Sequence, residues 1–180
     1  MPTLVWSLIE NQDLRLMRRC NNWLAPRWVR IWMLCATRGG DGWLWYTLGL
    51  ALCIFGGEGR FQAVGASFLA ATAGIGVFLK LKKSTGRKRP CAIAQHAWAT
   101  LLPPDQFSFP SGHTLTAFAV VTPLIGHYPA LAWHLLFCAV SIAASRIVLG
   151  MHFLSDVLAG AIIGALLGYF STGLIACVAW

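Results

Sequence analysis

The distribution of charge along the chain constrains its fold more than any other feature of the sequence. Within residues 106–180 only Arg146 and Asp156 carry a formal charge. About one quarter of the residues of a soluble domain are normally charged, against 11% in this chain. A soluble fold could not cover its surface with so few charged groups, so the sequence predicts an integral membrane protein.

Five apolar segments are predicted to form membrane-spanning helices. A helix needs about 20 predominantly apolar residues to cross a bilayer, and residues 61–79 and 157–180 lack formal charge over that kind of length. Gly160, Gly164 and Gly168 recur at four-residue spacing, which predicts a face that packs closely against another helix. The predicted spans are residues 42–57, 61–81, 112–128, 130–149 and 154–178.

The first 40 residues mix large apolar side chains with six arginines. This mixture is typical of an amphipathic helix in the membrane interface, and we expect an interruption near Pro26. A sixth span within residues 20–37 is the weaker alternative. No small-residue cleavage site follows a charged segment, so we expect no cleaved signal peptide. The predicted fold is an all-α integral membrane helical bundle with five to six transmembrane helices and an N-terminal amphipathic segment, in one domain over residues 1–180.

The net charge of the chain is +8, from 14 Lys and Arg against 6 Asp and Glu. The basic residues gather at 15–30 and 80–89, beside apolar segments, where they can contact anionic lipid headgroups. No nucleic-acid-binding motif accompanies them. We therefore expect membrane lipids and no nucleic acid as partners, and the sequence leaves the oligomeric state open. The residues interpreted as plain surface charge are Lys80, Lys83, Arg87 and Lys88.

Residues 82–111 form the longest segment outside the predicted spans. Their basic residues and prolines predict an irregular loop with short helical pieces at most. The next two spans cross the membrane and return near Arg146 and His152. Span parity therefore places this loop and the segment 146–152 on the same face of the membrane, and we predict an active-site loop at residues 82–111.

Three cations and a helix N-terminus on this face are suited to bind a phosphate group. Lys82, Arg89 and Arg146 supply positive charge, and arginine can donate to two phosphate oxygens at once. Ser111 and Gly112 open a predicted helix, where backbone N–H groups are exposed and glycine allows an anion to approach closely. We find no carboxylate cluster suited to Mg²⁺ and no Cys/His set suited to Zn²⁺, so we expect no metal and no other cofactor.

Two histidines on this face are predicted to have different roles. His152 and Asp156 are four residues apart at the start of a predicted helix. The carboxylate can therefore accept the proton of one ring nitrogen and leave the other as a nucleophile. His113 has no carboxylate nearby in sequence and is suited to act as a general acid toward the leaving oxygen. The alternative for Asp156 is a structural ion pair with Arg146.

Three motifs contain these residues, namely Lys82-x6-Arg89-Pro90, Pro110-Ser111-Gly112-His113 and Ser145-Arg146-x5-His152-x3-Asp156. All eleven specified positions agree with the signatures of the type 2 phosphatidic acid phosphatases. The chain resembles this family of lipid phosphate phosphatases, which is related to vanadium haloperoxidases. The resemblance implies a six-helix membrane bundle and metal-independent hydrolysis of a phosphate ester or pyrophosphate through a phosphohistidine at His152. It also implies that Asp156 orients His152, that His113 is the acid, and that phosphate is bound by Lys82, Arg89, Ser111, Gly112, Arg146 and Ser145.

An enzyme that dephosphorylates a membrane lipid is therefore the first functional hypothesis. An anion transporter could use the same cations, but it would more naturally have paired repeats with interrupted spans, and none is evident in the sequence. A haloperoxidase would not need the membrane and ranks last. Short chains of this kind resemble bacterial members of the family, which favours a polyprenyl (undecaprenyl) pyrophosphate as substrate. Phosphatidylglycerophosphate, phosphatidic acid and lipid A phosphates fit the same design.

The resemblance also implies a location, which is the bacterial inner (cytoplasmic) membrane with the active site on its outer face. The basic loop favours the cytoplasmic face by the rule that positive charge stays inside. Part of that charge belongs to the site itself, so it is not a clean signal of topology.

Overall fold

The computed structural model describes residues 4–93 and 106–178, with side chains from residue 8 onward. The regular secondary structure of these residues is helical, apart from an isolated bridge between Lys88 and Phe107. The middle of the predicted active-site loop, residues 94–105, lies outside the described residues. The helices are α1 (Leu4–Asn22), α2 (Arg27–Gly39), α3 (Trp43–Phe55), α4 (Arg60–Thr85), α5 (Pro90–Ile93), α6 (Gly112–His127), the 3-10 helix η1 (Pro129–Leu131), α7 (Ala132–Val148) and α8 (Leu154–Val178).

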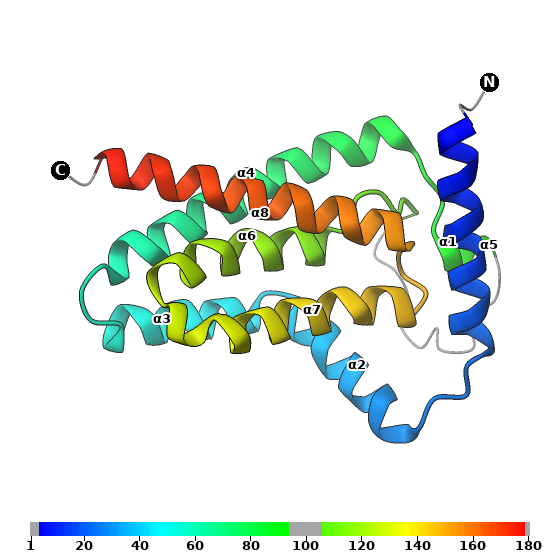
Figure 1. Cartoon of the computed structure of the whole chain (residues 1–180), viewed down its shortest axis with the longest axis horizontal. Coiled ribbons are helices and arrows are strands. Elements are labelled where there is room, and N and C mark those ends of the chain that lie inside the picture. The colour runs from blue at the N-terminus through cyan, green and yellow to red at the C-terminus, as the bar shows by residue number, and fades with distance from the viewer. Residues whose placement is uncertain (1–3, 94–105, 179–180) are drawn as a thin grey trace.

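Helices α4, α6 and α8 pack on one another at the centre of the bundle, and α7 covers α6 (Figure 1). The structure confirms the predicted close-packing face of α8 glycines. A Cβ atom at Gly160 would lie 2.7 Å from the Ser111 carbonyl oxygen, and one at Gly168 would lie 2.7 Å from Cβ of Thr122. At Gly164 the added atom would collide with the Leu115 carbonyl. The glycines therefore bring α8 into backbone contact with α6, and this contact aligns the first turns of the two helices.

Three segments of the described chain are long and apolar enough to cross a membrane, namely Arg60–Thr85, Pro129–Val148 and Leu154–Val178. They confirm three of the five predicted spans by length and composition. Helices α3 and α6 have 13 and 16 residues, fewer than the roughly 20 that a perpendicular crossing needs. Large apolar side chains on the outside of the bundle, such as Phe68 and Phe170, are more than half exposed, as expected for a surface that faces lipid.

The N-terminal segment forms two helices separated at Pro26, which confirms the predicted interruption. Helix α1 lies across the end of the bundle at which α8 begins (Figure 1). It buries Asp13 and Met17 and exposes Leu8. Helix α2 has 13 residues and packs against α7, with Val29 and Met33 buried beside Leu149 and Met151. These two helices therefore cover one end of the bundle, where the predicted site lies.

Helix α4 is longer than predicted and ends only at Thr85. Gly86 ends it with a φ of +58°, a left-handed conformation that glycine adopts at low cost. The boundary predicted at residue 82 is therefore wrong, and Lys82 lies in the last turn of a helix instead of in a loop. The helix fixes the direction from which Lys82 approaches the end of the bundle.

Candidate active site

His152 lies in the short link between α7 and α8, with its ring held at both nitrogens. The link turns at Gly150, whose φ is +67°, and the backbone N–H groups of Met151 and His152 both donate to the Arg146 carbonyl at 3.0 Å. The ring nitrogen Nδ1 is 2.6 Å from the Ser108 carbonyl oxygen, and Nε2 is 3.1 Å from Nη1 of Arg89. A carbonyl only accepts, so Nδ1 carries the hydrogen and Nε2 presents its lone pair.

The surroundings of His152 keep its ring uncharged. Burial of the ring lowers the pKa of His152 well below its ordinary value, and the positive charges of Arg146 and Arg89 lower that pKa further. A neutral imidazole with a fixed tautomer and a lone pair on the other ring nitrogen is the reactive form of a histidine nucleophile. This geometry suits Nε2 for attack on an electrophile that also binds the arginines.

Asp156 does not make the predicted hydrogen bond to His152. Its Oδ2 is 3.9 Å from Nδ1 of His152 and accepts instead from the backbone N–H of Phe153 at 2.9 Å. The prediction assumed helical geometry from His152 to Asp156, but α8 begins only at Leu154. The Ser108 carbonyl is therefore the direct orienting group for His152, and the fully buried Asp156 caps the start of α8 beside it.

The cation that pairs with Asp156 is Arg87, so the alternative of a pair with Arg146 is wrong, and so is the interpretation of Arg87 as plain surface charge. Arg87 Nη1 donates to Asp156 Oδ1 at 2.6 Å, and Nη2 donates to Asp13 Oδ2 at 2.7 Å. Asp13 also accepts from the backbone N–H of Ser155 at 3.1 Å. Arg87 thus connects helix α1 to the start of α8, directly behind His152.

Two further arginines are buried at the site, each 4% exposed. Arg89 Nη1 donates to the Met151 carbonyl at 2.9 Å as well as contacting Nε2 of His152. Arg146 Nη1 donates to the hydroxyl of Thr37 at 2.5 Å. The positive charges of both arginines act on the ring of His152. The structure therefore brings Arg89 and Arg146 together around His152, as the motifs predict.

The neighbouring Ser145 does not join this group. Its hydroxyl donates to the Ile142 carbonyl of the same helix at 2.6 Å. A serine that bonds back to its own helix has used its donor and cannot offer that hydrogen to a phosphate in this rotamer. The expectation that Ser145 binds phosphate is therefore not met by the geometry.

Ser111, Gly112 and Lys82 meet near the start of α6. The Ser111 hydroxyl lies 2.9 Å from that of Thr114, and the Ser111 backbone N–H donates to the Asp156 carbonyl at 3.1 Å. A Cβ at Gly112 would lie 3.1 Å from the Phe78 ring, and the Lys82 ammonium lies 4.6 Å from the centre of that same ring. Lys82 and the start of α6 therefore both lie against the ring of Phe78.

His113 lies on the other side of the site and has a carboxylate partner that the sequence did not indicate. Its Nε2 is 2.8 Å from Oδ1 of Asp41, in the turn between α2 and α3. Asp41 is 72 residues away along the chain, so no local spacing could reveal it. Ser108 and Thr37 were missed for the same reason, because they contact His152 and Arg146 across 44 and 109 residues of the chain.

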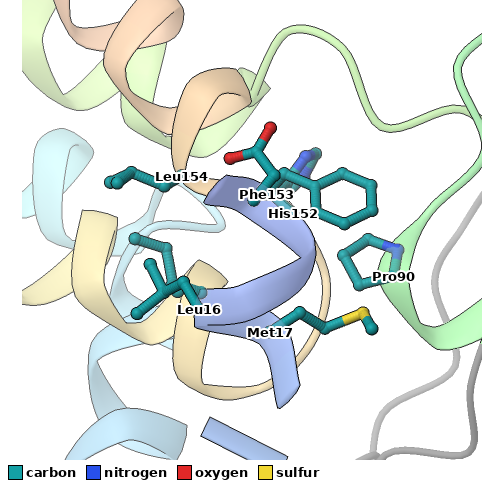
Figure 2. A pocket seen from close by; sticks show the side chains of 8 residues that line it. Leu16, Met17, Pro90, His152, Phe153 and Leu154 are labelled. Carbon is teal, nitrogen blue, oxygen red and sulfur yellow. The ribbon is translucent and has the colours of Figure 1, made fainter. Parts of the chain in front are cut away.

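A small pocket connects His152 with the N-terminal helix. Figure 2 shows Leu16 and Met17 of α1 together with Pro90, His152 and Phe153 around this pocket. The apolar side chains of α1 therefore form part of the wall beside His152. Among the described residues, no group of three or more His, Cys, Asp or Glu side chains could hold a metal ion, and arginines supply the positive charge instead.

The sequence is similar to one protein family and to curated members of known activity. Residues 62–176 match the PAP2 superfamily. The chain is 39% identical over 88 residues to phosphatidylglycerophosphatase B of Bacillus subtilis, covering 42% of this chain and 43% of that protein. It is 34% identical over 132 residues to a lipid A 1-phosphatase of Porphyromonas gingivalis, covering 67% of this chain and 27% of that protein. The chain thus spans less than half the length of these curated relatives.

Two solved structures have the same fold. LpxE of Aquifex aeolicus superposes with a TM-score of 0.75 at 31% identity, covering 88% of this chain and 93% of that one. A transmembrane PAP2-type phosphatidylglycerolphosphate phosphatase of Bacillus subtilis superposes with a TM-score of 0.69 at 24% identity, covering 93% of this chain and 86% of that one. The family match covers more than half of the chain. We conclude that this protein is an all-α integral membrane bundle that belongs to the PAP2 superfamily.

Proposed function

We propose that the protein hydrolyses a phosphate ester or pyrophosphate of a membrane lipid, with His152 as the nucleophile. The observation that carries this proposal is the ring of His152, whose Nδ1 is fixed on the Ser108 carbonyl and whose Nε2 lone pair faces Arg89. A phosphate placed between Arg89 and Arg146 would bring its phosphorus to Nε2. The same arginines would neutralise the charge that develops on its oxygens.

The reaction then has two steps. In the first, a bond forms between Nε2 of His152 and phosphorus, the bond from phosphorus to the lipid oxygen breaks, and His113 donates a proton to that oxygen. In the second, water attacks phosphorus and gives its proton to His113, and the bond from phosphorus to Nε2 breaks. The products are the dephosphorylated lipid and phosphate, and both histidines return to their starting forms.

An apolar cavity supports a lipid as the substrate. It lies between α3, α4 and α6, with Trp45, Phe68 and Val120 in its wall. One end of the cavity is at Gly42, the residue that follows Asp41, which contacts His113. An apolar tail in this cavity would therefore approach the site from the side of the proposed acid.

The names of the relatives favour phosphatidylglycerophosphate and lipid A 1-phosphate as substrates, whereas the sequence by itself favoured undecaprenyl pyrophosphate. A panel of these three lipids with phosphatidic acid, each presented in detergent micelles to the purified protein, decides among them by release of phosphate. The preferred lipid should exceed the others in kcat/KM by about tenfold or more, since each factor of ten needs only about 1.4 kcal/mol of differential binding. Release from none of the four lipids would refute the proposed activity.

The phosphohistidine is tested separately by rapid acid-free quenching after addition of a lipid carrying labelled phosphate. Label should appear on the protein, survive base and be lost in acid, as phosphoramidate bonds are. His152→Ala should carry no label. His134→Ala is the matched control, because His134 lies near the start of α7, away from the site, and it should label like the natural protein.

We place the protein in the bacterial inner membrane with its site on the outer face, as the resemblance to the family implies. Lys88 is exposed at the site end of the bundle, so a cysteine substituted there reports sidedness. In a variant otherwise free of cysteine, Lys88→Cys should react with a membrane-impermeant thiol reagent in intact spheroplasts. Reaction only after the cells are opened would place the site on the cytoplasmic face.

A further inference from the structure

The turn between α2 and α3 is built closely against the ring of His113. Gly40 allows this approach, because a Cβ atom there would lie 2.9 Å from Cδ2 of His113 and 3.0 Å from Cγ2 of Ile142. The next residue, Asp41, directs Oδ1 to within 2.8 Å of Nε2 of His113. Gly42 then reverses the chain with a φ of +118°, a value that favours glycine. The turn thus presents one carboxylate to one ring nitrogen.

This contact opposes the other electrostatic influences on His113. Burial of the ring disfavours a second proton most strongly, and the charges of Arg146 and Arg89 add to this effect, because a low dielectric and like charges both penalise the imidazolium. The Asp41 carboxylate favours that proton through its charge and its hydrogen bond. Arg38 is 3.8 Å from the other oxygen of Asp41 and is largely exposed, so water weakens its competing effect.

We infer that Asp41 is a positioning residue for His113, which holds the Nε2 hydrogen and so makes Nδ1 the atom that exchanges a proton with the leaving oxygen. This inference rests on the role of His113 given under the proposed function. Among the described residues Nδ1 of His113 makes no hydrogen bond. The residue lies before the segment 62–176 that matches the PAP2 superfamily, so the family motifs do not include it.

A carboxylate in this position makes the protonated ring easier to form in the presence of two arginines. When Nδ1 gives its proton to the leaving oxygen, the hydrogen on Nε2 stays directed at Asp41 and the ring keeps its orientation. Water attacking in the second step can then return a proton to the same Nδ1. Asp41 acts through His113 in both steps, without contacting the substrate.

The dependence of rate on the leaving group tests this inference, because only a group that assists protonation matters more when the leaving oxygen is basic. We would compare a short-chain phosphatidic acid, which leaves as an alkoxide, with p-nitrophenyl phosphate, which leaves without a proton. Asp41→Asn should lower kcat/KM, which reports only the steps up to formation of the phosphohistidine, by about tenfold or more for the alkyl phosphate, within the range of acid–base effects. For the aryl phosphate the change should be less than about twofold. Asp41→Glu, which keeps the charge, should recover part of the lost rate.

A double mutant tests whether Asp41 affects the rate through His113. If Asp41 acts through His113, then Asp41→Asn should cause no further loss in a His113→Ala background. Glu58→Gln is the matched control, since it converts an exposed carboxylate in the α3–α4 turn to an amide, and it should change neither rate. Gly40→Ala provides a second route, because the added methyl group displaces the His113 ring without removing a charge, and it should also reduce the alkyl rate selectively.

Equal losses on both substrates in Asp41→Asn and in Gly40→Ala would overturn the inference and make the turn a structural element. A further loss in the His113→Ala background would overturn it as well. The proposed role of His113 fails in a distinguishable way, since His113→Ala itself would then lose the same factor on both substrates. Melting temperatures measured in the same detergent assign any common loss to folding.

Discussion

The two histidines of the site are held in contrasting ways. His152 is buried and fixed at both ring nitrogens, by the Ser108 carbonyl and by Arg89. The side chain of His113 is 25% exposed and is held at one nitrogen by Asp41. The first histidine lies inside the segment that matches the family, and the carboxylate that holds the second lies outside it.

This difference corresponds to two chemical tasks. A nucleophile must present one lone pair in one direction, and burial with two fixed partners provides that at the cost of proton exchange. An acid must lose a proton to the substrate and regain one from water, so one ring nitrogen has to stay accessible. The environment of each histidine therefore suits the role that we propose for it.

The largest expected effect separates the two histidines by substitution. His152→Ala should reduce turnover by at least about a thousandfold on every substrate, since removal of a nucleophile abolishes the covalent route. His113→Ala should lose about a hundredfold or more on an alkyl phosphate. On p-nitrophenyl phosphate it should recover most of that loss, because this leaving group needs no proton. Steady-state rates on both substrates measure the difference. Equal rescue of the two variants would contradict the distinct roles assigned to the two histidines.

The next effect concerns Arg87, which supports the nucleophile side of the comparison. Arg87→Ala leaves the buried carboxylates of Asp13 and Asp156 without their shared cation. We expect a loss of about 3 kcal/mol in the free energy of unfolding, typical of a broken buried pair, and a fall in turnover of about tenfold or more. Thermal unfolding and kcat in the same detergent measure both. Lys88→Ala removes an adjacent exposed charge and should leave both unchanged, so similar effects in the two variants would argue against the proposed bridge.

The protonation of His152 provides a third test of how the two histidines differ. The pKa of His152 is lowered well below its ordinary value by burial and the two arginines, whereas an unfolded histidine titrates near pH 6.5. Between these values the unfolded chain binds a proton that the folded chain does not, so the free energy of unfolding falls as the pH drops through this window. The ¹⁵N NMR signals of His152 should therefore stay those of a neutral ring below pH 6. A midpoint near 6.5 would contradict the fixed neutral tautomer.

The smallest expected effect is that of chelation. Arg89 and Arg146 supply the positive charge near His152, so the mechanism needs no divalent cation to neutralise phosphate. EDTA should change kcat/KM by less than about twofold. Loss of activity that one specific metal restores would show that the arginines are insufficient, and the distinct roles assigned to the two histidines would then need revision.

The motifs predicted most of the residues that meet at the site, because each motif is short and span parity brings all three to one end of the bundle. The predictions made from motif spacing were wrong where the backbone changes direction. The spacing from His152 to Asp156 indicated a hydrogen bond along one helix face, but Gly150 turns the chain and the helix begins after His152. The spacing around Arg87 indicated surface charge, because its two carboxylates are 69 and 74 residues away.

The N-terminal helices show the same contrast between properties that local sequence predicts and contacts that it does not. Their mixture of arginine with tryptophan and leucine was sufficient to predict an interrupted amphipathic segment, because amphipathicity is a local periodic property. Nothing local distinguishes Asp13 from the other charged residues of α1 or Asp41 from an ordinary turn residue. Each acquires its role only when its helix or turn packs against the end of the bundle and places the carboxylate on Arg87 or on His113.

Local sequence properties were sufficient to show that the chain is helical and enters a membrane, and to predict that two histidines and three cations share one face. These properties follow from composition, hydrophobic length and span order, which are additive along the chain. Packing of distant segments was needed to show which carbonyl sets the tautomer of His152, which arginine pairs with Asp156, and which carboxylate holds His113. Hydrogen bonds depend on distances of about 3 Å and on direction, and long-range packing alone fixes both between residues far apart in the chain.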